Sequence, residues 1–283
     1  MGRVAIVTDS ASDLTADVAA AHGIRIVPLY VRFGQAEFRA GVDLSTAEFW
    51  ARMVAPDAPF PTTAAASPGD FAAAFEAELA AGADAIVCVT VGGKLSATIK
   101  SADLGAQGLP GREIHLVDSQ SASMGVGLLA IVAAELAAAG LPAAEIAAGV
   151  RSRIADIDIY VALDTIDYLR KGGRLSAARV AIATVLSVKP IITVVDGLVT
   201  IAEKPRTRAR ARARATALLT ARPVERIAFL HTQAPDLEAF RAGVLARLPR
   251  GVDPACVSTE VVGPSVGPHL GPGGVGAAML LQR

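Results

Sequence analysis

Two hydroxyl side chains, Thr63 and Ser96, stand where a protein can bind an anion. Ser96 lies between an apolar run at 85–91 and a predicted helix at 99–104, and Thr63 precedes a second predicted helix that begins after Ser67. Hydroxyls beside a helix N-terminus bind anions with the help of the helix dipole. Hydroxyls in the same places also cap helices. Taken singly, each position therefore supports capping at least as well as ligand binding.

A histidine, His269, lies in the glycine-rich segment 263–276. Glycine allows the backbone to approach a ligand or another segment closely. The end of this segment, 271–276, matches the G-x-G-x-x-G pattern of dinucleotide-binding folds, but it stops at residue 276 of 283. The helix and second strand that such a site needs have no room there. We therefore set a dinucleotide site aside, and His269 alone is compatible with an ordinary loop residue.

Ser96 and His269 are also the residue types of a serine esterase or thioesterase, in which a histidine activates the nucleophile. The context of Ser96 is Lys-Leu-Ser-Ala-Thr, which differs from the Gly-x-Ser-x-Gly turn of common hydrolases. We predict neither a metal nor a cofactor. Hydrolysis stays as the enzymatic alternative to a non-catalytic binding protein.

The composition excludes several classes of function. The 283 residues carry 27 basic and 27 acidic side chains, so no net field attracts nucleic acid or an anionic membrane. The apolar stretch 124–141 is interrupted by Glu135 and is rich in alanine and glycine, which predicts a buried helix and no stable membrane insertion. The two cysteines, with an N-terminus that leads directly into a strand, predict a cytoplasmic protein.

The first half of the chain alternates short apolar runs with amphipathic segments, which is typical of a mainly parallel sheet covered by helices. A capping box at Ser45, and a capping residue at Ser67 followed by Pro68, mark two of the helix starts. Loops at the carboxyl ends of such strands commonly bind ligands. The predicted strands are 4–8, 25–31, 85–91 and 114–117.

The second half has a different character, and we predict a smaller α+β domain there, with boundaries of 1–156 and 157–283. Asp196-Gly197 between two apolar runs indicates a β-hairpin. Arginine alternates with alanine at 206–215, which favours a helix with a solvated arginine face. The predicted strands are 158–163, 190–195, 226–231, 258–262 and 275–281.

Several short segments, taken in order along the whole chain, resemble the DegV family of bacterial fatty-acid-binding proteins. They are 8–10, Thr63 with 67–68, 95–98, 118–119, 163–176, 189–190 and 267–276. The resemblance implies a two-domain α/β architecture that buries a long-chain fatty acid such as palmitate in a tunnel. It implies that Thr63, Ser96 and His269 bind the carboxylate.

The resemblance also implies a partner. A separate ATP-dependent fatty acid kinase would convert the presented carboxylate to an acyl phosphate for phospholipid synthesis, and the carrier itself would turn nothing over. Arg174 matches the family position associated with kinase docking, and a surface salt bridge is the alternative for this residue. A lipid-responsive regulatory protein with a different partner is a further alternative.

The sequence departs from the family pattern around the head-group residues. Ala64 and Ala65 follow Thr63, and Gly92 and Gly93 stand where the family commonly has serines. We expect fewer polar groups to support the site. Ala97 replaces a customary glycine, which would be strained if the backbone there had a positive φ.

Overall fold

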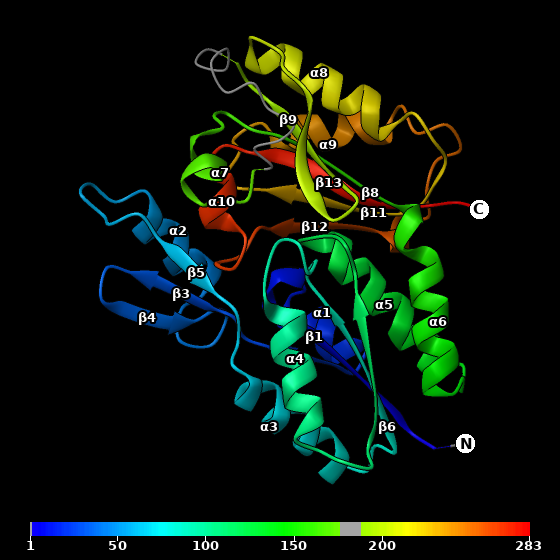
Figure 1. Cartoon of the computed structure of the whole chain (residues 1–283). Helices are drawn as coiled ribbons and strands as arrows, with labels where there is room; N and C mark the ends of the chain where they lie inside the picture. The colour runs from blue at the N-terminus through cyan, green and yellow to red at the C-terminus, as the bar shows by residue number, and fades with distance from the viewer. Residues whose placement is uncertain (1, 176–187) are drawn as a thin grey trace.

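A parallel four-stranded sheet forms the centre of the N-terminal part (Figure 1). The structure is a computed structural model that describes residues 2–175 and 188–283, so Ser176, at the end of the 163–176 segment, lies outside the described residues. The strands lie in the order β2 (Ile24–Val27), β1 (Val4–Asp9), β6 (Ala85–Thr90) and β7 (Glu113–Asp118). Every residue of β6 is buried, as a central parallel strand requires. The predicted parallel sheet is confirmed.

Helices cover both faces of this sheet. On one face lie α3 (Pro68–Ala80) and α4 (Thr98–Gln107), and on the other lie α5 (Met124–Ala138) and α6 (Ala143–Arg153). A 3-10 helix, η1 (Ser10–Ser12), follows β1, and α1 (Ala16–Ala21) packs against β2.

The apolar helix α5 packs between the N-terminal sheet and the C-terminal sheet, and its first eleven residues are all buried. The prediction of a buried helix at this position is confirmed. In the parts of the chain that the structure describes, no helix is long and apolar enough to cross a membrane.

A small antiparallel sheet lies beside the first one, in the order β4 (Ala36–Arg39), β3 (Tyr30–Phe33), β5 (Thr62–Ala64). The prediction of a single strand over 25–31 is wrong at this point. The chain leaves the parallel sheet after β2 and enters the small sheet at β3, with Pro28 between them. Proline lacks the N–H that a ladder needs and has a fixed φ, so the strand breaks there.

The small sheet holds Thr63 in place, because Thr63 on β5 pairs with Val31 on β3. Helix α2 (Thr46–Met53) packs against it through Phe49 and Trp50 and begins with the predicted capping box at Ser45. The Trp50 indole Nε1 donates to the Val262 carbonyl at 2.8 Å. This bond ties the small sheet to the C-terminal part of the chain.

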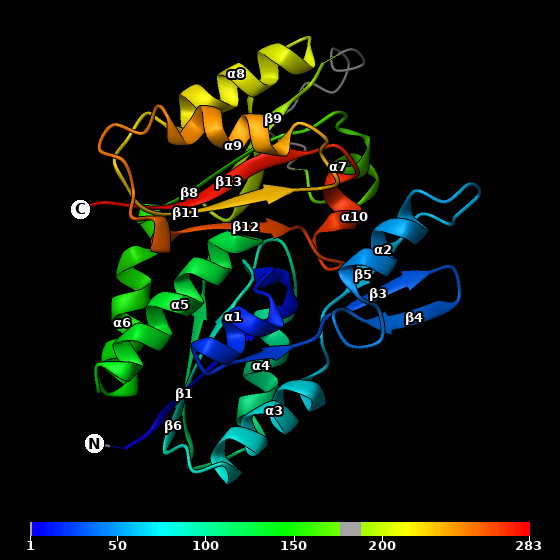
Figure 2. The same ribbon diagram turned by 180° about the vertical axis from the view of Figure 1, so that it is seen from behind.

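The C-terminal part is built on a six-stranded mixed sheet. A 3-10 helix, η2 (Ile154–Asp156), leads into strand β8, and another, η5 (Pro254–Cys256), precedes the edge strand β12. Figure 2 shows this sheet stacked on the N-terminal part. The spatial order is β10 (Leu198–Glu203), β9 (Ile191–Val195), β8 (Ile157–Ala162), β13 (Val275–Leu281), β11 (Val224–His231) and β12 (Val257–Val261). The predicted β9–β10 hairpin forms, with its turn at Asp196-Gly197.

Neighbouring residues along these strands point to opposite faces and enter different cores. On β11, Ile227 and Phe229 pack beneath α8 (Arg208–Leu219) and α9 (Leu237–Leu245), whereas Ala228 and Leu230 face the N-terminal part. The face toward the N-terminal part joins a hydrophobic core that spans both halves of the chain. The domain boundary after residue 156 therefore stays a proposal.

The arginine run lies in helix α8, as predicted, except for Arg206, which precedes the N-cap Thr207, and the two rows of arginines on the helix differ. Arg210 and Arg214 are exposed, but Arg208 and Arg212 are half-buried and pair with Asp236. The prediction of a solvated face holds for the first row and is wrong for the second. Arg212 also donates to the carbonyls of Ala162 and Gly273, each at 2.8 Å, so it fastens the helix to the sheet.

Candidate functional site

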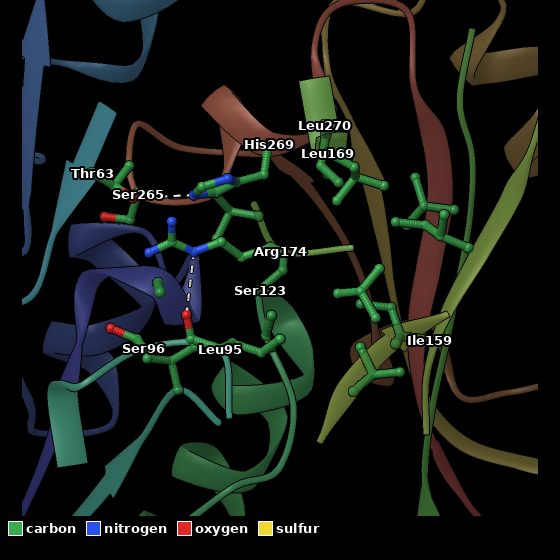
Figure 3. Close-up of a pocket in the computed structure, with 18 of the residues that line it drawn as sticks. Thr63, Leu95, Ser96, Ser123, Ile159, Leu169, Arg174, Ser265, His269 and Leu270 are labelled. Carbon is green, nitrogen blue, oxygen red and sulfur yellow. Dashed lines mark hydrogen bonds between the residues drawn. The ribbon is translucent and has the colours of Figure 1, made fainter. Parts of the chain in front are cut away.

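One pocket is lined by the small sheet, by the C-terminal sheet and by segments that follow the strands of the parallel sheet, and we call it the central pocket (Figure 3). Two short helices close it on one side, namely α7 (Asp167–Lys171) and α10 (Gly267–Leu270). The residues at one end carry polar groups, and those from the six-stranded sheet are aliphatic except for Thr193. The polar residues of its lining include Thr63, Ser96, Ser123, Arg174, Ser265 and His269.

Thr63 and His269 are brought together although they lie far apart in the sequence. The Thr63 hydroxyl and His269 Nε2 are 3.1 Å apart, in hydrogen-bonding distance. Thr63 comes from β5 and His269 from α10, whose short turn is held by the glycine-rich segment. Gly271 and Gly273 have positive φ, and a side chain at either would overlap Tyr168 or Asp164. Glycine in this segment thus serves close packing.

Ser96 lies at the opposite side of the polar end, in the loop between β6 and α4. Its hydroxyl is 2.7 Å from that of Thr98. Helix α4 has Ala97 at its N-cap and receives no side-chain cap, so Ser96 does not cap it. Ser67 caps α3, which leaves the Thr63 hydroxyl with His269. The capping alternative is therefore wrong for both Thr63 and Ser96.

The imidazole of His269 sits in an environment that keeps it neutral. Burial lowers the pKa of His269 to about 4, and the positive charge of Arg174 acts in the same direction. Nδ1 is buried and, among the described residues, has no hydrogen-bond partner. Gly172 leaves room for the ring, because a Cβ at that position would overlap Nδ1.

Arg174 lines the central pocket and is half-buried. Its Nη1 donates to the Gly172 carbonyl at 2.7 Å, and its Nε donates to the Leu95 carbonyl at 3.3 Å. Within residues 2–175 and 188–283 it forms no ion pair, so the surface salt bridge considered from the sequence is not seen there. The guanidinium instead places a positive charge between Ser96 and His269 (Figure 3).

Two further serines of the pocket escaped the sequence analysis. Ser123 has φ 54° and ψ −145°, a conformation that costs roughly 1–3 kcal/mol and occurs often at functional sites. Its hydroxyl donates to Asp13, whose other oxygen accepts from the Gly263 N–H at 2.9 Å. Ser265 is 2.8 Å from the Ser10 hydroxyl. Both serines depend on contacts between distant segments, which no local pattern reveals.

The apolar end of the pocket is a wall of aliphatic side chains from the C-terminal sheet. They belong to β8, β9, β10 and β11 and include Ile159, Val161, Ile192, Val199 and Leu230. All five are nearly buried. The pocket is therefore amphiphilic, with hydrogen-bond donors and a cation at one end and hydrocarbon at the other.

The hydrolase arrangement is weakly supported by the geometry. Ser96 bonds to Thr98 and His269 bonds to Thr63, so the serine and the histidine are not a hydrogen-bonded pair. A catalytic histidine is normally oriented by a third group on its other nitrogen, and Nδ1 of His269 has none among the described residues. In that same part of the chain, no cluster of three His, Cys, Asp or Glu could hold a metal.

A family model described as an uncharacterised protein of the DegV family matches residues 3–282. The chain belongs to the DegV family. This match covers all three sheets and the polar residues named for the central pocket, so the resemblance seen in the short segments is confirmed over the whole chain.

Relatives within the DegV family agree with the fold. A DegV domain-containing protein of Streptomyces coelicolor is 36% identical over 283 residues, with 98% of each chain covered. A fatty-acid-binding DegV family protein from Thermus thermophilus has a TM-score of 0.88 at 33% identity, covering 99% of this chain and 100% of that one. A stearic acid-binding protein from Eubacterium ventriosum has a TM-score of 0.87 at 26% identity, covering 99% and 98%. The predicted architecture of a parallel sheet followed by a separate C-terminal sheet is confirmed.

The departures from the DegV pattern are accommodated without strain. Ala97 has φ −74°, so the strain anticipated for a positive φ does not arise. A Cβ at Gly93 would lie 2.9 Å from the Asp118 carboxylate, which accepts from the Gly93 N–H. Ala64 and Ala65 line the pocket with methyl groups, so polar groups are fewer beside Thr63.

Proposed function

We propose that this DegV-family chain binds one long-chain fatty acid in the central pocket. The observation that carries the proposal is the amphiphilic lining, with Thr63, Ser96, His269 and Arg174 at one end and the aliphatic wall at the other. Related proteins of known structure are described as fatty-acid-binding, one of them with stearic acid. The carboxylate lies at the polar end and the acyl chain runs along the C-terminal sheet.

The two ends contribute differently to binding. Each buried methylene contributes about 0.8 kcal/mol, so a chain of roughly sixteen carbons offers around 12 kcal/mol before the costs of association. A carboxylate removed from water without partners is strongly penalised. Two hydroxyls and the half-buried guanidinium offset that penalty, and neutral His269 can donate one further hydrogen bond. The tail supplies affinity and the polar end supplies orientation.

The bound lipid is the first thing to measure. Purified protein, extracted under denaturing conditions and examined by mass spectrometry, is expected to release about one long-chain fatty acid per chain. Protein that is empty, and whose fluorescence and melting temperature do not respond to added fatty acid, would contradict the proposal.

Replacing the hydroxyls tests where the carboxylate lies. Thr63→Val keeps the shape of the side chain but removes a hydrogen bond to a charged group, which is worth about 1.5–3 kcal/mol. We expect Thr63→Val and Ser96→Ala each to weaken fatty acid binding by roughly ten- to a hundredfold, measured by titration calorimetry after delipidation. Thr62→Val is the matched control, because Thr62 is the exposed neighbour on the same strand and does not line the pocket.

The lipid is presented to a separate ATP-dependent kinase, which converts carboxylate and ATP to acyl phosphate and ADP. This part of the proposal rests on the family resemblance. Loaded protein, ATP and extract of the source organism are expected to yield acyl hydroxamate when hydroxylamine is added. If Arg174→Ala keeps its fatty acid but loses this product, Arg174 serves docking; loss of the fatty acid itself assigns Arg174 to the head group.

We place this function in the cytoplasm. Both cysteines are free thiols in the structure, Cys88 buried and Cys256 half-buried, which suits a reducing compartment. Fractionation of the source cells with an antibody to the chain checks the location.

A further inference from the structure

A second hollow lies behind the hairpin β9–β10, and we call it the rear groove. It is lined by the loop after β7, the end of α6, the start of β8 and the hairpin turn. The hairpin tip is fixed against the N-terminal part, because Lys94 Nζ donates to the Asp196 carbonyl at 2.8 Å. Ile159 and Val194 line both the central pocket and the rear groove. These two side chains therefore form part of the wall between the two spaces.

Strand β8 leads from one space to the other along a single face. Side chains two residues apart lie on the same face of a strand. Along this face of β8, Val161 lines the central pocket, Ile159 lines both spaces and Ile157 lines the rear groove. Ile159 therefore occupies the boundary.

The neighbouring strand β9 repeats this order in the opposite chain direction. It pairs antiparallel with β8, with Ile192 opposite Val161. Ile192 lines the central pocket, Val194 lines both spaces, and Asp196 lines the rear groove. Two adjacent strands thus place one aliphatic side chain each at the same boundary.

We propose that Ile159 and Val194 are the distal stop of the acyl site and set the longest chain that binds with its full affinity. The proposal rests on the proposed fatty acid function and deepens it. Figure 3 places Ile159 on the side of the pocket away from Thr63 and Ser96, where the methyl end of a chain lies if its carboxylate is held at the polar end.

The rear groove is a poor environment for hydrocarbon beyond the stop. Its lining includes the carboxylates of Asp118 and Asp196, the amide of Gln120 and the guanidinium of Arg151. A methylene that reaches this groove remains beside polar groups and solvent, so it gains little from burial. The affinity should rise by about fourfold for each methylene up to the stop and then level off.

The test uses delipidated protein and a series of saturated fatty acids from medium to very long chain. Ile159→Ala and Val194→Ala remove the stop, so we expect the plateau of affinity to move to chains longer by two carbons or more. Val194→Ala is the milder change, because Val194 is half-exposed, and it keeps the test valid if Ile159→Ala unfolds.

Two matched controls lie on the same strand face. Ile157→Ala, on the groove side, should leave the whole affinity profile unchanged. Val161→Ala, inside the central pocket, should weaken binding at every length without moving the plateau. An unchanged plateau in folded Ile159→Ala and Val194→Ala overturns the stop. Wild-type protein that binds no member of the series overturns the fatty acid function itself, so the two failures are distinguishable.

Discussion

The tight contact between His269 and Gly172 makes the head-group end sensitive to a single methyl group. Gly172 ends helix α7 with φ −74°, a conformation that alanine adopts freely. A side chain at position 172 is therefore excluded by its neighbours and not by the backbone conformation. The space is occupied by the His269 ring, which also holds Thr63. A methyl group there must displace the imidazole.

Gly172→Ala is expected to weaken fatty acid binding by about tenfold or more, because the displaced ring loses its bond to Thr63. Calorimetric titration after delipidation measures this effect. The control is Gly173→Ala: Gly173 has φ +67° with nothing within 4 Å of an added Cβ, so alanine there costs roughly 1–2 kcal/mol of stability but leaves the pocket intact. Equal affinities for wild type and Gly172→Ala would contradict the importance of the ring position.

At the scale of elements, Arg212 of helix α8 bonds to groups of the C-terminal part outside its own helix. Arg212 is 11% exposed, pairs with Asp236 at 2.9 Å and donates to the carbonyls of Ala162 and Gly273. Removing one partner of such a network leaves buried groups unpaired. Gly273 belongs to the glycine-rich segment that follows α10, so the same arginine side chain also holds this segment in place.

Arg212→Ala should lower the free energy of unfolding by about 3 kcal/mol, as measured by urea denaturation. Arg210→Ala, on the exposed row of the same helix, should change it by no more than roughly 0.5 kcal/mol. If both variants unfold at the same urea concentration as the wild type, the attachment described for Arg212 does not contribute to stability.

Local signals in the sequence predicted most elements, because each signal acts within a few residues. The capping box at Ser45, the cap at Ser67 and the Asp196-Gly197 turn are all present. The small sheet is not predicted because β3, β4 and β5 are short strands. In addition, β2 and β3 differ only in the sheet that they join, which no local pattern shows. Pro28 was the available signal, since proline interrupts a ladder.

At the scale of the whole molecule, Asp13 links the two halves of the chain. It accepts from Ser123 and from the Gly263 N–H. Burial raises the pKa of the Asp13 carboxyl to about 7, against the opposing effect of these two hydrogen bonds, and burial raises that of Asp9 to about 6. An acid whose pKa is higher in the folded state favours folding while it is protonated, and that contribution is lost as the pH rises.

Between about pH 4 and pH 7, the range from the ordinary value of 3.8 to the raised pKa, ionisation of Asp13 should lower the free energy of unfolding. Asp13→Asn removes this titration, so the free energy of unfolding should fall less steeply as the pH rises. The pH dependence that remains is the one due to Asp9. Urea denaturation across this pH range measures the slope. Asp17→Asn, an exposed residue of α1, is the control, and an unchanged slope in Asp13→Asn would refute the assignment.

The assembly of the site could be predicted only in part. Thr63, Ser96 and His269 were singled out, yet their bonding partners were not, because Thr63 and His269 are separated by 206 residues. Asp13 and Gly263 are 250 residues apart. For Arg174 the sequence suggests kinase docking or a surface salt bridge, because nothing in Lys171-Gly-Gly shows that the chain turns back toward Leu95. Contacts of this range follow from topology and not from local pattern.

The polar end of the central pocket is assembled from both halves of the chain, because Thr63 and Ser96 come from the N-terminal half and Arg174 and His269 come from the C-terminal half. A ligand held by all four stabilises only the closed, folded chain, and at a hundred times its dissociation constant it adds about 2.7 kcal/mol. On the proposed function, the lifetime of the protein against cellular proteases depends on lipid supply. Cells starved of fatty acid would then carry less of this carrier, with no change in its synthesis.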